Sequence, residues 1–292
     1  MTMAATITDG ANARAALTGL LRNYSAEVTA RDKKGIDAAP DLLPKGAEVF
    51  VANLPNDDFD KLVAACAQIR KSGLTPVPHM VARNTHSTAE LDEVFARLVG
   101  EAGLDRALIL GGDRDHPVGE LDSALQILKT GLIQKHGIGN IFISCYPEGH
   151  PRIADEVLED ARAAKLAAAA EAGLHVTLVS QFCFDAGAVI ALTRRMRALG
   201  QTAPYRVGVA GPADRGKLIK FALMCGVGAS LRALKERQEL SKAMMTGETP
   251  EALLTEVAEA QAADPSLGLE GVHFFTFGDL PGSVKFAEGC KR

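Results

Sequence analysis

Short apolar runs alternate along the chain with longer stretches in which apolar residues recur every three to four positions. The short runs are rich in β-branched residues and predict eight strands, at Tyr24–Thr29, Glu48–Ala52, Thr75–Val81, Arg106–Leu110, Asn140–Cys145, His175–Ser180, Tyr205–Val209 and Gly271–Phe277. The longer stretches predict helices between them, among others over residues 57–73, 87–103, 120–137 and 152–173. This alternation of strand and helix is typical of a parallel sheet.

The spacing of the strands favours a closed barrel. Through the seventh strand they begin roughly 25–35 residues apart, which is the length of one strand–helix unit. We therefore predict an α/β protein with a single (β/α)8 barrel of the TIM type over residues 1–292. An open doubly wound sheet is the rival, but such a sheet usually carries a glycine-rich turn after an early strand, and here TARDKKG follows the first strand.

Two segments exceed a minimal barrel. Residues 1–20 form an N-terminal extension that we expect to include a helix. The interval between the seventh and eighth strands is long, and residues 228–268 indicate a helical insertion of two helices, with GETPEA as the turn. We assign both segments to the one catalytic domain.

Composition narrows the class of protein. The 292 residues carry 32 Lys and Arg against 36 Asp and Glu, a net charge of −4, which argues against nucleic-acid and anionic-membrane partners. The N-terminal sequence resembles no secretory signal, and no apolar run approaches the roughly 20 residues that cross a bilayer. The five cysteines form no C-x-x-C pair, which fits a reducing compartment. We expect a soluble, cytoplasmic protein.

Polar residues stand where the predicted strands end. In a barrel of this kind the active site lies at the carboxyl ends of the strands, so these side chains are expected to converge on one mouth. They are Glu27, His79, Gly111-Gly112-Asp113, Tyr146, Glu148, His150, Gln181 and Asp185.

Glu27 has two interpretations. It lies between Ala26 and Val28 in an extended run, where partial burial would raise the pKa of its carboxyl, as a general acid near neutral pH requires. Alternatively it is a structural carboxylate paired with Arg31 or Arg83. The residue types alone leave both interpretations open.

The other strand ends also carry a plain structural interpretation. Gly111-Gly112 either lets a cofactor approach the strand end or forms a turn that needs positive φ, and the turn is favoured. A lone histidine such as His79 in an apolar strand is more often a core residue than a ligand. The sequence contains no H-E-x-x-H, and no H-x-H ends the first strand, so we expect no catalytic metal.

Six of these motifs, in order along the chain, resemble the methylenetetrahydrofolate reductase family of eight-stranded barrels. They are SAEV at 25–28, PHMVAR at 78–83, LILGGD at 108–113, SCYPEGHP at 144–151, SQFCFD at 180–185 and GVHFFTF at 271–277. Single pieces are weak signals, but six in the family's order over nearly the whole chain are specific.

The resemblance implies reduction of 5,10-methylenetetrahydrofolate to 5-methyltetrahydrofolate by NADH or NADPH through bound FAD, with ping-pong hydride transfer. Glu27 would protonate folate N10 to open the ring. Gln181 would recognise the pterin edge, and Asp113 would lie near flavin N1 and O2 and tune the flavin's potential. Arg215 follows the seventh strand, where relatives carry an aromatic residue, and is assigned to the substrate.

The resemblance also implies a set of cofactor contacts. His79, Tyr146 and His150 match positions that contact FAD, Asn53 is a weaker candidate, and Gly112 belongs to the turn beneath the flavin. Arg162 and Lys165 are the bases in the helix after the fifth strand that would meet the cofactor phosphates.

Departures from the family pattern keep other functions open. Gly111 stands where the family has an arginine, and Phe277-Gly278-Asp279 replaces the stretch that usually contains another, so two positive charges are absent. One alternative is therefore a flavin-independent, NADH-dependent folate reductase. Another is a pterin-binding barrel of the methyltransferase type, and a third is folate binding without catalysis. We expect a small-molecule folate partner, and base rates favour a homodimer.

Overall fold

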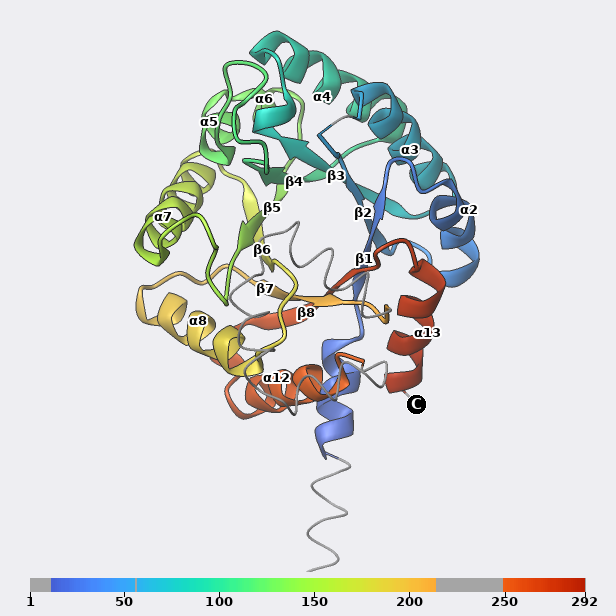
Figure 1. Ribbon diagram of the computed structural model, residues 1–292, viewed down its shortest axis with the longest axis vertical. Coiled ribbons are helices and arrows are strands. Elements are labelled where there is room, and N and C mark those ends of the chain that lie inside the picture. Colours follow the sequence, from blue (N-terminus) through green and yellow to red (C-terminus); the bar gives the residue numbers. More distant parts are fainter. Residues whose placement is uncertain (1–11, 56, 214–248, 292) are drawn as a thin grey trace, which may run out of the picture. The chain divides into compact units, whose positions relative to one another are not determined.

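The computed structural model describes residues 12–55, 57–213 and 249–291 (Figure 1). Its parallel strands follow one another in chain order and close into a barrel, so the predicted TIM-barrel fold is confirmed. The strands are β1 Ser25–Thr29, β2 Glu48–Ala52, β3 Thr75–Val81, β4 Arg106–Leu110, β5 Asn140–Cys145, β6 His175–Ser180, β7 Tyr205–Ala210 and β8 Leu269–Phe275.

Helices separate the strands. They are α2 Lys33–Leu42, α3 Phe59–Lys71, α4 Thr88–Ala102, α5 Ala124–Lys129, α6 Leu132–Lys135, α7 Asp155–Glu171, α8 Ala186–Ala198, α12 Glu251–Ala263 and α13 Leu280–Cys290, with 3₁₀ turns η1 Ala82–Asn84 and η2 Pro265–Leu267. Residues 12–20 are also helical. Side-chain caps explain several helix starts, because Asp58, Ser87 and Asp185 each accept a hydrogen bond from the backbone N–H three residues on.

The chain divides into two compact units, which we describe separately. The N-terminal unit comprises Ser25–Cys145 and Ile153–Val179. The C-terminal unit comprises Met1–Tyr24, Tyr146–Arg152 and Ser180–Arg292, of which the structure describes the ranges given above. The assignment of residues 1–292 to one catalytic domain stays a prediction.

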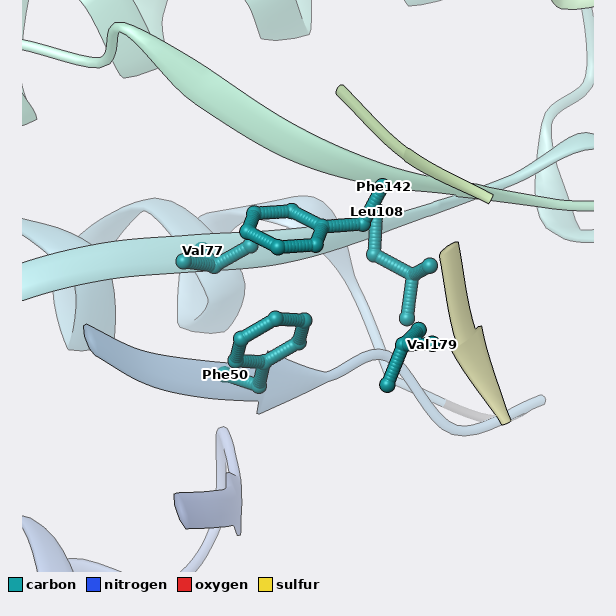
Figure 2. Close-up of a cluster of buried hydrophobic side chains, with 5 residues drawn as sticks. All are labelled: Phe50, Val77, Leu108, Phe142 and Val179. Atoms are coloured by element: carbon teal, nitrogen blue, oxygen red, sulfur yellow. The ribbon is translucent and has the colours of Figure 1, made fainter. Parts of the chain in front are cut away.

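An apolar cluster forms the interior of the N-terminal unit (Figure 2). Each of five strands, β2 to β6, contributes one buried side chain: Phe50, Val77, Leu108, Phe142 and Val179. Figure 2 shows these side chains pointing toward one another, and the rings of Phe50 and Phe142 meet edge to face with centroids 4.8 Å apart. Such interdigitation fills a barrel with side chains.

The strand register sets which polar residues face this interior. Glu27 pairs with Phe50 on the neighbouring strand, so both lie on the inner face of the sheet. His79 is two residues beyond Val77, and alternate residues of a strand share a face. The carboxyl and the imidazole are thus both placed just above the apolar cluster.

The C-terminal unit has its own aromatic cluster. Phe182 and Ala210 are buried at its centre, and four partly buried side chains pack against them: Phe184, Ala213, Phe275 and Phe277. Strands β7 and β8 pair over their whole length, with one irregularity beside Tyr205. A Cβ at Gly208 would collide with the backbone oxygen of Ser180, so only glycine allows β7 to approach Ser180 this closely.

Two predicted elements differ in extent from those observed. The eighth strand begins at Leu269 and ends at Phe275, two residues earlier than expected, because Phe277 has φ +50° and Gly278 φ +82°, which end the extended chain. The helix expected over 120–137 is two short helices, because Gly131 between them has φ +74°.

The helical insertion is described in part. Within residues 228–268, α12 and η2 are observed, and residues 228–248 lie outside the described part of the chain. No helix among the described residues is long and apolar enough to cross a bilayer.

Candidate functional site

Glu27 and His79 face each other in the N-terminal unit. His79 Nε2 lies 3.3 Å from Glu27 Oε2, and the side chains are 10% and 19% exposed, respectively. The His79 ring also meets the Phe50 ring edge to face, with centroids 6.3 Å apart. A partly exposed carboxyl beside an imidazole and an apolar ring can exchange a proton with a bound ligand.

The structural interpretation of Glu27 named two arginines, and both have carboxylate partners elsewhere. Arg31 forms an ion pair with Asp57. Arg83 Nε lies 2.7 Å from Asp122 Oδ1, and its Nη1 donates to the carbonyl of Arg114. The described ion-pair contact of Glu27 is the imidazole of His79. Both interpretations of Glu27, as acid and as structural carboxylate, stay predictions.

An amide and guanidinium network lies at the ends of β2, β3 and β4. Asn84 Nδ2 donates to Asn53 Oδ1 over 3.0 Å, and Arg114 Nε donates to Asn84 Oδ1 over 2.9 Å. Asn53 is buried, and its Nδ2 has no hydrogen-bond partner among the described residues. That amide is a buried donor available to a ligand.

Sequence reasoning identified Asn53 but missed Asn84 and Arg114. Asn84 directly follows the PHMVAR motif and Arg114 directly follows LILGGD, so adjacency to the two motifs was the available signal. Neither residue type at these positions has a fixed chemical role, and only the fold brings them to Asn53.

Gly112 has φ +106°, which confirms that the turn after β4 needs positive φ at this position. A Cβ there would lie 2.5 Å from Val81 Cγ1 and 3.4 Å from Arg83 Cβ, so the turn packs tightly against the end of β3. Asp113, the next residue, is exposed. The turn thus combines a backbone that packs on β3 with an accessible carboxylate.

The two predicted phosphate-binding bases lie on α7. Arg162 is 4% exposed, and Lys165 is partly buried. Burial lowers the pKa of Lys165, and the nearby charge of Arg162 lowers it further, while Cys145 opposes the shift. An anion between two desolvated cations would relieve their repulsion.

In the C-terminal unit, Glu148 connects two loops. Its Oε1 accepts hydrogen bonds from the backbone N–H groups of Phe184 (2.6 Å) and Asp185 (2.9 Å). Burial raises the pKa of Glu148, while the two N–H groups act in the opposite direction. Tyr146 and His150, on either side of Glu148, meet edge to face with centroids 5.4 Å apart.

Gln181 follows β6 at the start of the segment that Glu148 holds. Its Oε1 accepts from the N–H of Phe182 over 3.1 Å. This bond leaves the Nε2 donors, which have no hydrogen-bond partner among the described residues, to a ligand. Cys183 donates its thiol to Gly208 O, as a structural cysteine does.

The predicted site residues thus fall into two described groups. In the N-terminal unit Glu27 contacts His79, and Asn53, Gly112, Asp113, Arg162 and Lys165 belong to the same unit. The C-terminal unit holds Tyr146, His150 and Gln181. Arg215 lies outside the described residues, and the expectation that all strand ends form one mouth stays a prediction.

The cysteines that the structure describes are buried thiols. Cys66, Cys145, Cys183 and Cys290 are free and buried, and Cys225 lies outside the described residues. Within the described ranges, no group of three or more His, Cys, Asp or Glu side chains is placed to hold a metal ion.

Comparisons with known proteins agree with the motifs. The family model described as methylenetetrahydrofolate reductase matches residues 56–277, which is more than half of the chain. Among solved structures, the chain is similar to dihydropteroate synthase from Thermus thermophilus, with 15% identity, a TM-score of 0.47, and coverage of 91% of this chain and 93% of that one.

A second structure is that of a protein described as a lyase/mutase from Burkholderia cenocepacia. It has 15% identity and a TM-score of 0.48, over 94% of this chain and 85% of that one. At these identities and TM-scores, neither likeness bears on function.

Proposed function

Because the chain belongs to the methylenetetrahydrofolate reductase family, we propose that it reduces 5,10-methylenetetrahydrofolate to 5-methyltetrahydrofolate with NAD(P)H and bound FAD. The observation that carries the proposal is the Glu27 carboxyl, which faces inward beside His79 above an apolar floor. Opening the folate ring requires a proton at N10, and a partly buried carboxyl can hold that proton ready.

Glu27 would donate its proton to N10, which breaks the bond from N10 to the bridging carbon and leaves an iminium ion at N5. A hydride then adds to the bridging carbon and completes the methyl group. His79, 3.3 Å from the carboxyl, would return a proton to Glu27. The net reaction consumes one hydride and one proton.

Gln181 would recognise the pterin. Its Oε1 is held by the N–H of Phe182, so its Nε2 presents two donors. Arg215, from the sequence alone, is assigned to the same substrate.

Two features of the described residues fit FAD. The buried Nδ2 of Asn53 has no hydrogen-bond partner among them, and a flavin ring edge offers acceptors. Lys165 and Arg162 are neighbouring cations whose repulsion a diphosphate would relieve. The family resemblance adds His79, Gly112 and Asp113 of the N-terminal unit, and Tyr146 and His150 of the C-terminal unit, as proposed FAD contacts. When bound, FAD supplies the carrier that takes hydride from the nicotinamide and gives it to folate.

The proposal is tested on the purified protein. We expect flavin absorbance, or its gain on added FAD, together with NADH or NADPH oxidation that depends on 5,10-methylenetetrahydrofolate. A protein that oxidises neither nucleotide in the presence of this folate, with or without FAD, is not this reductase. Folate binding without reduction would instead favour the methyltransferase type of barrel.

A second candidate is flavin-independent reduction, with hydride passing directly from NADH to folate. Gly111 removes one positive charge of the family pattern, and Asp279 stands in the stretch where the other is usual. Asp279 is an acidic residue, and its carboxylate caps α13 by accepting a hydrogen bond from the Gly282 N–H. Folate-dependent NADH oxidation by flavin-free protein, unchanged by added FAD, would establish this candidate over the first.

A further inference from the structure

Glu148 links segments that are far apart in the sequence. It lies in the loop after β5, and the N–H groups that it accepts, those of Phe184 and Asp185, lie 36 and 37 residues further along. Both bonds reach one oxygen, Oε1, so a single carboxyl group fixes the spacing of two loops. Hydrogen bonds to carboxylates are among the stronger ones in proteins.

The surroundings of the Glu148 carboxyl are unfavourable for a charged group. Oε2 is buried and has no hydrogen-bond partner among the described residues. Burial and the nearby Asp185 carboxylate both raise the pKa of Glu148. Burying a carboxyl costs free energy that an apolar side chain of similar size would not cost. The benefit that Glu148 provides in return is its pair of hydrogen bonds from the two N–H groups.

The segment that receives these bonds carries Gln181. Gln181 Oε1 bonds to Phe182 N–H, the Phe182 and Phe184 rings meet edge to face at 5.9 Å, and Asp185 caps α8. The loop that provides the carboxyl carries Tyr146 and His150 on either side of it. Glu148 therefore joins the residue assigned to folate to a pair assigned to the cofactor.

We propose that Glu148 is a positioning residue that sets the spacing between Gln181 and the Tyr146–His150 pair, and so aligns folate with the hydride donor. This inference rests on the proposed function for the identity of the ligands. Alignment of reacting groups is worth a large rate factor, and a displacement of about 1 Å can cost about a hundredfold.

The test compares Glu148→Ala with Glu148→Gln. Alanine removes the acceptor, whereas glutamine keeps a neutral Oε1 that can accept both N–H groups. In Glu148→Ala we expect kcat/KM for folate and the FAD affinity, measured by flavin fluorescence titration, each to fall about tenfold or more. Glu148→Gln should restore most of both quantities.

Glu120→Ala is the matched control. Glu120 also accepts a backbone N–H from a distant segment, that of Thr88 over 2.6 Å, but it is exposed and outside the candidate site. Its removal should leave folate kinetics and FAD affinity unchanged.

Hydrogen exchange separates failure of this inference from failure of the proposed function. Faster exchange at the Phe184 and Asp185 amides in Glu148→Ala, with unchanged FAD affinity and folate kinetics, would overturn the positioning role and leave a structural one. Unchanged exchange at these two amides would show that Glu148 does not hold the Phe184–Asp185 segment, and would overturn the inference. If the alanine variant does not fold, a Glu148→Gln protein with tenfold weaker FAD and folate parameters would also contradict the inference. Inactive wild-type protein that still binds FAD would count against the proposed reaction alone.

Discussion

Glu27 is the residue at which the proposed proton transfer can be tested directly. Glu27→Gln preserves the size of the side chain and most of its hydrogen bonding but removes the acidic proton. We expect kcat for folate reduction to fall about 10²–10⁴-fold, because that is the usual contribution of a positioned general acid. Steady-state kinetics measures this change, and calorimetric titration of folate should show a dissociation constant altered only a few-fold.

Glu120→Gln provides the control for Glu27→Gln, since the Glu120 carboxyl is exposed in the segment between β4 and α5, whereas Glu27 lies in β1. A Glu27→Gln enzyme that turns over at the wild-type rate would show that another group protonates folate. Loss of both turnover and folate affinity would indicate a binding role in place of an acid.

Glu148 predicts a pH dependence of stability. Burial raises the pKa of its carboxyl above the ordinary value of 4.5, so the folded state holds this proton more tightly than the unfolded chain does. The stability that this protonation contributes is fully present below pH 4.5 and is lost as pH rises through the folded-state pKa.

The free energy of unfolding of wild type, minus that of Glu148→Gln, should therefore decrease as the pH is raised from about 4 to about 8. Urea unfolding of both proteins across this range measures the difference. A difference that grows with pH would mean that the two backbone N–H groups outweigh burial and hold the carboxylate form.

At the scale of elements, the approach of β7 to the segment that starts at Ser180 depends on Gly208. Its N–H donates to Ser180 Oγ over 2.7 Å, its carbonyl accepts from Cys183 N–H over 3.1 Å, and a Cβ would overlap the backbone oxygen of Ser180. Because backbone must shift to admit a methyl group, we expect Gly208→Ala to lower the free energy of unfolding by about 1–3 kcal/mol.

Gly139→Ala is the control for Gly208→Ala. A Cβ at Gly139 meets nothing within 4 Å, and its φ is not positive, so the change should stay within about 0.5 kcal/mol. Thermal or urea unfolding compares the two variants. Equal stability of the two would show that the segment after β6 yields easily.

The elements were largely predictable, because strand patterns are local. Seven of the eight strands have both boundaries within one residue of the apolar runs, and the eighth strand and the helix expected over 120–137 differ for local reasons. Phe277 adopts positive φ although phenylalanine rarely does, so its residue type gives no indication of this backbone conformation. Gly131 breaks a helical pattern that its neighbours would continue.

The candidate site was predictable by position but not by partner. Active sites of such barrels lie at the carboxyl ends of the strands. This rule identifies Glu27, His79 and Glu148 from the sequence. The partners come from the fold: the 3.3 Å contact of Glu27 with His79 joins residues 52 positions apart, and the two amides at Glu148 lie on another loop. No local pattern encodes such distances.

At the scale of the whole molecule, much of the stability depends on the apolar interior. Phe50 is fully buried in the cluster of Figure 2 and meets Phe142 edge to face. We expect Phe50→Ala to lower the free energy of unfolding by about 3–5 kcal/mol, a large part of a typical total of about 5–15 kcal/mol. Urea unfolding monitored by circular dichroism measures this.

Val118→Ala is a suitable comparison for Phe50→Ala, because Val118 is 38% exposed and its loss should change stability by about 0.5 kcal/mol or less. A Phe50→Ala protein that loses less than about 1 kcal/mol would mean that the cluster collapses to refill the space.

The position of Tyr146 has a practical consequence for chemical labelling. The chain has three tyrosines and no tryptophan, and Tyr24 and Tyr205 are buried, which leaves Tyr146 as the partly exposed phenol beside His150. A mild nitrating reagent should therefore modify Tyr146 first, as peptide mass mapping would show. Its nitrophenol absorbs visible light and titrates near neutral pH, so this one ring would become a coloured probe of whatever binds next to it.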